Sequence, residues 1–231
     1  MLELDGVHSY YDRSHALHGM RLSVPRGGIT AVLGRNGMGK TTLLKTLMGL
    51  EVRSEGRITF DGQAIEHLPT HLRAQRGLAY VPQGRGIIPD FTVRQNIEMG
   101  GFAARPRALR IPEIVGELFP YLMANLDRPG GVLSGGQQQQ LAIARALASA
   151  PRVMLLDEPN EGIQPSIVEQ IERAIVRLNR ELGLTLVLVE QNLAFARQCA
   201  SDFAMLEKGT VKAQGPIATL TQDVVDRYLT I

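Results

Sequence analysis

A glycine-rich stretch has the residue types and spacing of a phosphate-binding loop. Residues 34–41 read GRNGMGKT and fit the pattern G-x-x-x-x-G-K-[ST]. Glycines let the backbone turn tightly enough for successive N–H groups to face a phosphate. We expect Lys40 to reach the β- and γ-phosphates of a nucleotide and the Thr41 hydroxyl to bind Mg²⁺. The alternative is a tight strand-to-helix turn with an exposed lysine. The residues of this loop predicted to contact the nucleotide are Gly34, Arg35, Asn36, Gly37, Met38, Gly39, Lys40, Thr41 and Thr42, of which Arg35 either contacts it or faces solvent.

Two adjacent carboxylates follow a second apolar run. Residues 153–156 read VMLL and lead into Asp157, Glu158 and Pro159. A carboxylate at the end of a buried strand can hold Mg²⁺, and its neighbour can orient and activate an attacking water. We therefore predict Asp157 as a metal ligand and Glu158 as a general base. The alternative is that the two acids only end a strand before the turn at Pro159.

A third motif, LSGGQ at residues 133–137, precedes a helical stretch. Serine is a favoured N-cap residue, and the two glycines permit close approach of a ligand. The motif resembles a second helix N-terminus that binds phosphate. The alternative is a glycine-rich cap with no ligand. The predicted contacts are Ser134, Gly135, Gly136 and Gln137.

The elements that must position these motifs alternate along the chain. Short runs of β-branched and aliphatic residues without alternation are typical of strands buried on both faces, and helical stretches separate them. This order predicts an α/β fold with a parallel sheet. The expected strands are 29–33, 153–156 and 184–189, and the expected helices are 40–50, 137–150 and 166–182.

Two further regions differ from this core. Alternating residues at 2–4 and 20–24, with a strand-to-turn pattern at 57–62, predict an antiparallel patch. Strand patterns fade after Arg85, where 93–101 and 112–122 look helical and Pro106, Pro112 and Pro120 are expected breaks. We predict one domain: an α/β core with the antiparallel patch at 1–85 and 151–214, a helical subdomain at 86–150, and a tail at 215–231 that packs on its own domain.

Composition excludes several classes of protein. With 25 Lys and Arg against 23 Asp and Glu, the net charge is only +2, which argues against a nucleic-acid partner. The nearest basic run, Arg105–Arg110, is better explained as a solvated face. One cysteine, Cys199, excludes an intrachain disulfide, and five histidines scattered along the chain predict no metal cluster. No apolar run reaches the ~18 residues of a membrane helix, so a membrane role requires a partner.

The order of the motifs resembles the ABC (ATP-binding cassette) ATPase family over essentially the whole chain. GRNGMGKT, the YVPQ sequence at 80–83, LSGGQ and LLDEP occur in the family's order. The resemblance implies a P-loop ATPase with a RecA-like core, ATP and Mg²⁺ as cofactors, and LSGGQ residues that contact the ATP held by a second subunit. It assigns Tyr11 to stacking on adenine, although ordinary packing or a role for Tyr10 are alternatives. It assigns Gln83 to sensing Mg²⁺ and the γ-phosphate.

Two positions depart from the common family pattern. Gln191, in VEQN, replaces the switch histidine and cannot take up a proton near neutral pH. Gln164 stands near the place where many relatives carry aspartate. Both replacements argue against equal hydrolysis at two sites. We expect Gln191 to act with Lys40 and Glu158 in catalysis.

These departures restrict the resemblance to a smaller group within the ABC family. VEQN resembles one of the two ATPase subunits of bacterial branched-chain amino acid importers, and strings such as VPQGRGIIP and DEPNEGIQPSI resemble their urea and short-chain amide branch. The resemblance implies an ATPase that powers an importer of urea or short-chain amides, with branched-chain amino acids as the alternative. Its implied partners are a second ABC ATPase subunit in a heterodimer, two transmembrane permeases and, indirectly, a periplasmic or extracellular solute-binding protein. Its implied place is peripheral, on the cytoplasmic face of the inner membrane.

Alternatives from other classes remain open at this point. A non-transport ABC ATPase usually carries two cassettes or a long coiled-coil insertion, and this sequence has neither. A weakly hydrolysing regulatory module is disfavoured by intact Lys40, Asp157 and Glu158, but Gln191 leaves it open.

Overall fold

A six-stranded sheet forms the centre of the molecule. The computed structural model describes residues 1–50, 52–104 and 109–229. In the sheet order β10-β9-β3-β8-β7-β6, all strands are parallel except β10, which pairs antiparallel with β9. The strands are β3 (Ile29–Leu33), β6 (Leu78–Val81), β7 (Val153–Asp157), β8 (Thr185–Glu190), β9 (Asp202–Glu207) and β10 (Thr210–Pro216). All residues of β3, β7 and β8 are buried, which explains their unbroken apolar runs.

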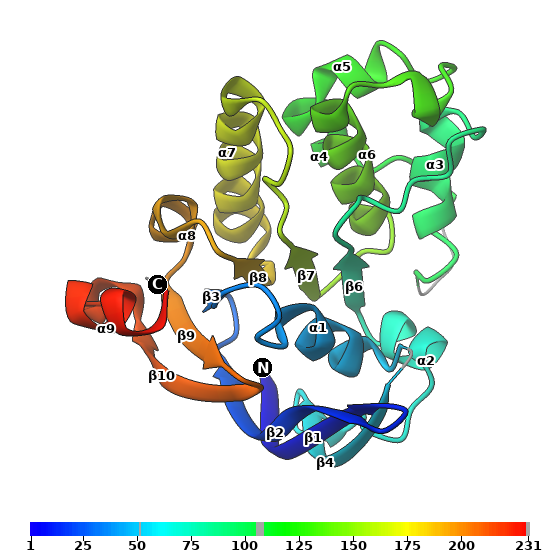
Figure 1. Ribbon diagram of the computed structural model, residues 1–231. Coiled ribbons are helices and arrows are strands. Elements are labelled where there is room, and N and C mark those ends of the chain that lie inside the picture. The colour runs from blue at the N-terminus through cyan, green and yellow to red at the C-terminus, as the bar shows by residue number, and fades with distance from the viewer. Residues whose placement is uncertain (51, 105–108, 230–231) are drawn as a thin grey trace.

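A second, four-stranded antiparallel sheet has the order β2-β1-β4-β5 and confirms the predicted antiparallel patch. Its strands are β1 (Leu2–Tyr11), β2 (Ser14–Val24), β4 (Arg53–Phe60) and β5 (Gln63–Ala64). Helix α1 (Lys40–Met48) lies between the two sheets (Figure 1). Apolar residues of α1, such as Leu43 and Leu47, join one hydrophobic cluster with Leu4 of the small sheet and Val187 of the large one.

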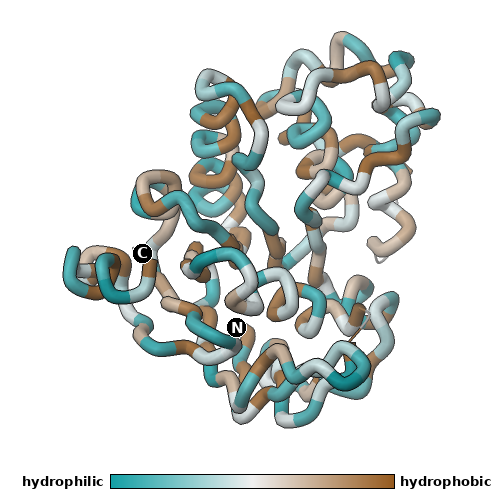
Figure 2. The backbone as a smooth tube through the Cα atoms, viewed as in Figure 1, coloured by the Kyte–Doolittle hydropathy of each residue, from teal (hydrophilic) through white to brown (hydrophobic). Residues whose placement is uncertain are grey.

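The other face of the large sheet is covered by helices (Figure 1). These helices are α6 (Gly135–Leu147), α7 (Pro165–Leu182), α8 (Leu193–Cys199) and α9 (Gln222–Tyr228). Helices α3 (Val93–Gly100), α4 (Glu113–Leu118) and α5 (Pro120–Met123) stand beyond the sheet, where α3 and α5 pack against α6 and α4 packs against α5 (Figure 1). Short elements complete the chain: α2 (Thr70–Gln75) and 3-10 turns at Gly130–Val132 and Ile217–Thr219. In Figure 2 the apolar segments concentrate along the central strands and the hydrophilic ones along outer turns.

The helical region follows the predicted pattern with local differences. Pro120 separates α4 from α5, because proline lacks an N–H and disfavours a helical residue before it; Phe119 has φ −133° and ψ 63°. The first two residues of the predicted tail, Gly215 and Pro216, belong to β10 instead. Val225 of α9 is buried in the core cluster of the large sheet. Pro106 and most of the Arg105–Arg110 run lie outside the described residues, as does the end of the tail. Within the described residues, no helix combines the length and apolarity needed to cross a bilayer.

Candidate active site

The phosphate loop joins β3 to α1 and is held by close backbone packing. A Cβ atom at Gly34 would lie 2.6 Å from the carbonyl oxygen of Leu206 on β9, so only glycine fits there. Gly39, immediately before α1, has φ +99°, which side chains rarely adopt. These two positions let the loop fold over the carboxyl end of β3 and deliver Lys40 at the first turn of α1.

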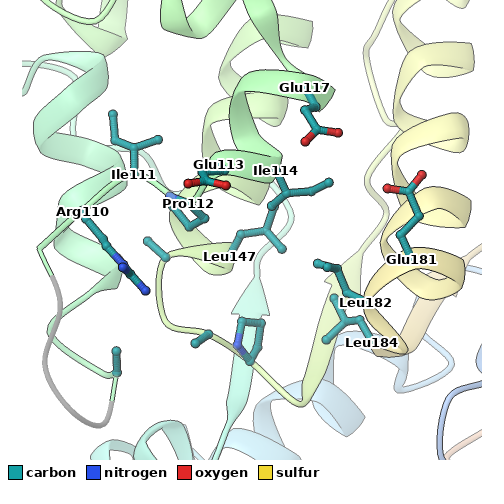
Figure 3. Close-up of a pocket in the computed structure, with 14 residues that line it drawn as sticks. Arg110, Ile111, Pro112, Glu113, Ile114, Glu117, Leu147, Glu181, Leu182 and Leu184 are labelled. Carbon is teal, nitrogen blue, oxygen red and sulfur yellow. The ribbon is translucent and has the colours of Figure 1, made fainter.

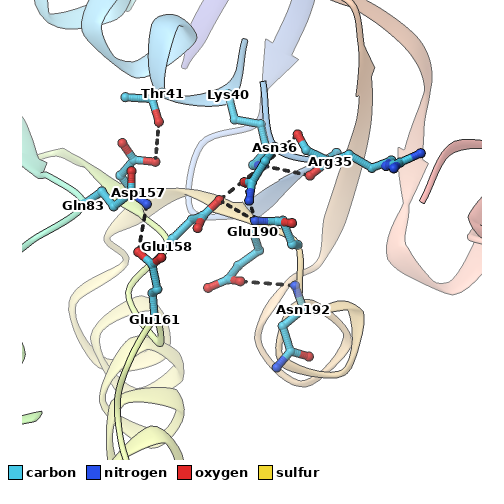
Figure 4. A network of polar contacts seen from close by, with 12 residues as sticks. Arg35, Asn36, Lys40, Thr41, Gln83, Asp157, Glu158, Glu161, Glu190 and Asn192 are labelled. Carbon is cyan, nitrogen blue, oxygen red and sulfur yellow. Dashed lines mark hydrogen bonds and ion pairs between the residues drawn. The ribbon is translucent and has the colours of Figure 1, made fainter. Parts of the chain in front are cut away.

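The Lys40 ammonium group is buried inside its own loop. It donates to the carbonyl oxygens of Gly34 and Arg35 at 2.8 and 3.1 Å. It also forms an ion pair with Glu158, with Nζ 3.2 Å from Oε1, and the two side chains are 4% and 10% exposed. The cation that would meet a terminal phosphate and the carboxylate predicted as a base thus lie side by side (Figure 4).

Thr41 and Asp157 also meet at this edge of the sheet. The Thr41 hydroxyl donates to Asp157 Oδ1 at 3.2 Å, and the Tyr80 hydroxyl donates to Oδ2 at 3.1 Å. Burial raises the pKa of Asp157, while the hydrogen bonds from Thr41 and Tyr80 favour its ionised form. A hydroxyl and a carboxylate oxygen at this separation fit the oxygen ligands that Mg²⁺ prefers.

Gln83 follows β6 and is held by a residue that the sequence did not single out. Its amide donates to Glu161 Oε2 at 2.8 Å, as Figure 4 shows. Glu161 lies in the turn after the acidic pair. In this arrangement Gln83 borders a cavity beside the phosphate loop while its amide is bonded to the opposite loop.

Gln191 reaches the same cluster from the end of β8. Its side-chain amide donates to Asn36 Oδ1 at 2.5 Å and to Glu158 Oε1 at 3.2 Å. Three segments that are distant in sequence therefore meet here: the phosphate loop through Asn36 and Lys40, the turn after β7 through Glu158, and the end of β8 through Gln191. An amide can hold a carboxylate in place but cannot exchange protons with it near neutral pH.

A cavity of about 610 Å³ opens beside these groups. Asp157 and Gln191 reach this site through Thr41 and Glu158 rather than as wall residues. The side chain of Arg35 is exposed and extends away from the cluster in Figure 4. The predicted residues that line the cavity are Asn36, Gly37, Gly39, Lys40, Thr41, Thr42, Gln83 and Glu158.

Histidines form part of the cavity wall, which the sequence did not indicate. His15 and His18 line the cavity, whereas Tyr11 does not. The expected scatter of histidines is wrong for three of them: His8 Nδ1 is 3.0 Å from His15 Nε2, and the rings of His15 and His18 are 3.9 Å apart. Burial, followed by the charges of His15 and His8, lowers the pKa of His18. Tyr10 stacks on His15 at 4.4 Å, and the Tyr11 ring lies 6.0 Å from Lys45 Nζ on α1.

The LSGGQ residues lie apart from this cavity in the same chain. Ser134 and Gln137 form a reciprocal capping box at the start of α6. A Cβ at Gly136 would lie 2.5 Å from the Ile167 side chain of α7, and one at Gly135 would lie 2.9 Å from Arg85. Packing within the chain therefore requires glycine at 136, independently of any ligand, whereas at 135 the end of the long Arg85 side chain can move aside.

A larger cavity of about 980 Å³ contains none of the predicted site residues. Figure 3 shows it between α4 and the carboxyl end of α7, with Ile114, Leu182 and Leu184 on its walls and Glu113, Glu117 and Glu181 around it. The paired basic and acidic groups expected for phosphate chemistry are at the smaller cavity, so the smaller cavity is the candidate active site.

Comparisons with known proteins agree with this geometry. A family model described as "ABC transporter" matches residues 17–161. The high-affinity branched-chain amino acid transport ATP-binding protein BraG of Pseudomonas aeruginosa is 40% identical over 232 residues, 99% of each chain. The probable branched-chain amino acid transport ATP-binding protein LivF of Archaeoglobus fulgidus is 35% identical over 217 residues, covering 93% of this chain and 92% of LivF.

The fold also matches a solved structure of an ATP-binding cassette. A dimeric post-hydrolysis state of the ATP-binding cassette MJ0796, bound to ADP and Pi, matches with a TM-score of 0.82 and 27% identity over 94% of this chain and 99% of that one. The predicted fold class is confirmed. The chain belongs to the ABC transporter family, as an ATP-binding subunit that hydrolyses ATP and works with transmembrane permeases.

Proposed function

We propose that this subunit powers the import of branched-chain amino acids. The observation that carries the proposal is the 40% identity to BraG over 99% of both chains. LivF, which is named as a probable transporter subunit for the same solutes, supports it. These relatives favour the amino acid alternative over the urea and short-chain amide reading drawn from the sequence.

Lys40, Glu158 and Gln191 supply the catalytic groups in this proposal. Lys40 binds the β- and γ-phosphates and stabilises the charge that develops on them. Glu158 is paired with Lys40 at 3.2 Å and is released when a phosphate takes its place beside Lys40. It then orients the attacking water and accepts a proton from it. The Gln191 amide holds the Glu158 carboxylate in the required position.

Thr41, Asp157 and Gln83 are the proposed ligands of Mg²⁺. The bound ion would neutralise charge on the β- and γ-phosphates during transfer. Thr41 and Asp157 are already within hydrogen-bond distance of each other. Gln83 would join them through its amide oxygen, while its amide nitrogen is the atom that donates to Glu161.

The second half of each site comes from a partner subunit. Ser134–Gln137 lie at the amino end of α6, where Ser134 is exposed, and do not line the cavity of their own chain, so they are proposed to contact the nucleotide of the partner. Since Gln191 replaces a titratable switch histidine, we propose a heterodimer whose other subunit retains the histidine. Tyr11 is proposed to pack against adenine.

Closure of this pair on ATP would move the permeases. ATP binds both Lys40 of one subunit and the LSGGQ segment of the other, so it favours the closed state. The helical region 86–150 acts as the moving lobe and Gln83 as its link to the core. The complex lies on the cytoplasmic face of the inner membrane and receives its solute from a binding protein outside.

Uptake by a reconstituted complex tests the proposal. The chain is assembled in vesicles with candidate permeases, a candidate paired ATPase and a candidate binding protein from its own organism. Uptake of labelled leucine, isoleucine, valine and urea is then measured with internal ATP. We expect uptake of the three amino acids and none of urea. Uptake of urea alone would refute the amino acid assignment, and failure of Glu158→Gln to stop uptake would refute the role of this site.

A further inference from the structure

A buried carboxyl group at the end of β8 is unexplained by the proposed chemistry. Glu190 is 1% exposed, although it adjoins the exposed Gln191. Its Oε2 atom accepts a hydrogen bond from the backbone N–H of Asn192 at 3.3 Å, and its Oε1 atom has no hydrogen-bond partner within the described residues. Burying an acid with one unpaired oxygen destabilises the fold, so its presence calls for an explanation.

The bond from Asn192 to Glu190 spans Gln191. On the other side of this turn, the Asn192 side chain accepts a hydrogen bond from the Phe195 N–H at 3.1 Å and begins α8. Gln191 is therefore fixed between the last residue of a buried strand and the first cap of a helix. Its amide is thereby directed at Asn36 and Glu158.

The charged and titratable groups near Glu190 come from three elements. Lys40 of α1 and Glu158 after β7 act on its ionisation, and the Cys199 thiol of α8 is itself affected by Glu190. Burial, with a further contribution from Glu158, raises the pKa of Glu190 to about 8. At neutral pH the group is mostly an uncharged carboxylic acid, which can accept from Asn192 without placing a second charge beside Glu158.

We propose that Glu190 is a positioning residue whose buried carboxyl group holds the 190–192 turn and so sets the place of the Gln191 amide. The inference rests on the proposed role of Gln191 in the active site. The turn therefore still carries a titratable group, Glu190, which lies one residue before the position expected for the switch histidine and is buried in the core. Ionisation of Glu190 would place a second negative charge near Glu158 and so change the surroundings of the Gln191 amide.

The test observes the Gln191 side-chain amide directly in the full chain by ¹⁵N NMR, with its cross-peak assigned by loss of the signal in Gln191→Ala. Glu190→Gln keeps an uncharged acceptor of the same shape. Glu190→Leu removes the acceptor. Thr30→Val on β3 is the matched control, because it also removes a buried side-chain oxygen without a partner but lies opposite Val187, three residues before Glu190 on β8. Thermal unfolding verifies that each variant is folded.

We expect the Gln191 peak to keep its position in Glu190→Gln and Thr30→Val and to move to the position of a water-exposed glutamine in Glu190→Leu. In the native chain the peak should also move with pH, with a midpoint near 8, and this movement should vanish in Glu190→Gln. The titration remains decisive if Glu190→Leu does not fold. An unchanged peak in folded Glu190→Leu, or an identical titration in native chain and Glu190→Gln, would overturn the inference.

A kinetic comparison separates this inference from the proposed function. In the reconstituted complex, ATP hydrolysis by Gln191→Ala is expected to fall about tenfold in kcat with little change in KM, as for loss of an orienting contact. Unimpaired Gln191→Ala would refute the catalytic role of Gln191 while the NMR result still decides whether Glu190 positions it. A slow Gln191→Ala with an unmoved peak in Glu190→Leu refutes only the positioning.

Discussion

The stability of this protein is expected to fall with rising pH because of Glu190. Its pKa is raised from 4.5 to about 8, first by burial and then by the nearby charge of Glu158. The folded chain therefore holds this proton more tightly than the unfolded chain, and stability present below pH 4.5 is lost as the pH rises towards 8. Each pH unit well inside that interval costs about 1.4 kcal/mol, and the slope falls to half at the pKa, so the step from pH 6 to pH 8 removes about 2 kcal/mol.

Urea unfolding of the native chain and Glu190→Gln at pH 6, 7 and 8 measures this effect. The matched variant subtracts other titrating groups, including His18, whose pKa is lowered. The Cys199 thiol does not interfere, because its ordinary pKa of 9 and its folded value of about 12 both lie above the window. The difference in free energy of unfolding between the two proteins should change by about 2 kcal/mol. A constant difference across these pH values would refute the argument that Glu190 is buried and protonated.

Three other changes have expected outcomes. Arg73 is 2% exposed and donates to the carbonyl oxygens of Thr46, Leu47, Glu66 and Leu68, so Arg73→Met should lower the free energy of unfolding by about 3 kcal/mol or more in urea; a loss below 1 kcal/mol would contradict this. Asp157→Asn should raise the Mg²⁺ concentration needed for half-maximal ATP hydrolysis by about tenfold or more, since it removes a carboxylate ligand. An unchanged Mg²⁺ titration would exclude Asp157 as a ligand. Tyr11→Ala should weaken ATP binding about tenfold in calorimetry, while Tyr11→Phe preserves it. Native affinity in Tyr11→Ala together with a loss in His15→Ala would place adenine against His15 instead.

The local parts of the site could be predicted from the sequence because short motifs determine them. GRNGMGKT specifies both the turn and the helix that follows, and the structure places Lys40 at the first residue of α1. The apolar runs before the loop and before Asp157 have the length and composition of buried parallel strands, and β3 and β7 occupy them. Ser134 and Gln137 form the cap that their three-residue spacing indicates.

Contacts between distant segments could not be predicted in this way. The bond from Gln83 to Glu161 joins two loops 78 positions apart, and no periodicity or spacing signals it. The histidine cluster depends on the register of β1 against β2, which the sequence does not specify residue by residue. Burial of Glu190 depends on packing around the end of β8, although a strand-end acid beside Gln191 was a visible signal that sequence reasoning left unused.

The central claim is that ATP is hydrolysed at the site formed by Lys40, Asp157 and Glu158. The most direct measurement is phosphate release from radiolabelled ATP by the reconstituted complex, in which the paired subunit carries its own inactivating change, comparing the native chain with Glu158→Gln. We expect Glu158→Gln to bind ATP normally and to release phosphate at least about 100-fold more slowly, since a positioned general base contributes at least that factor. Equal rates of phosphate release from the two proteins would contradict the account.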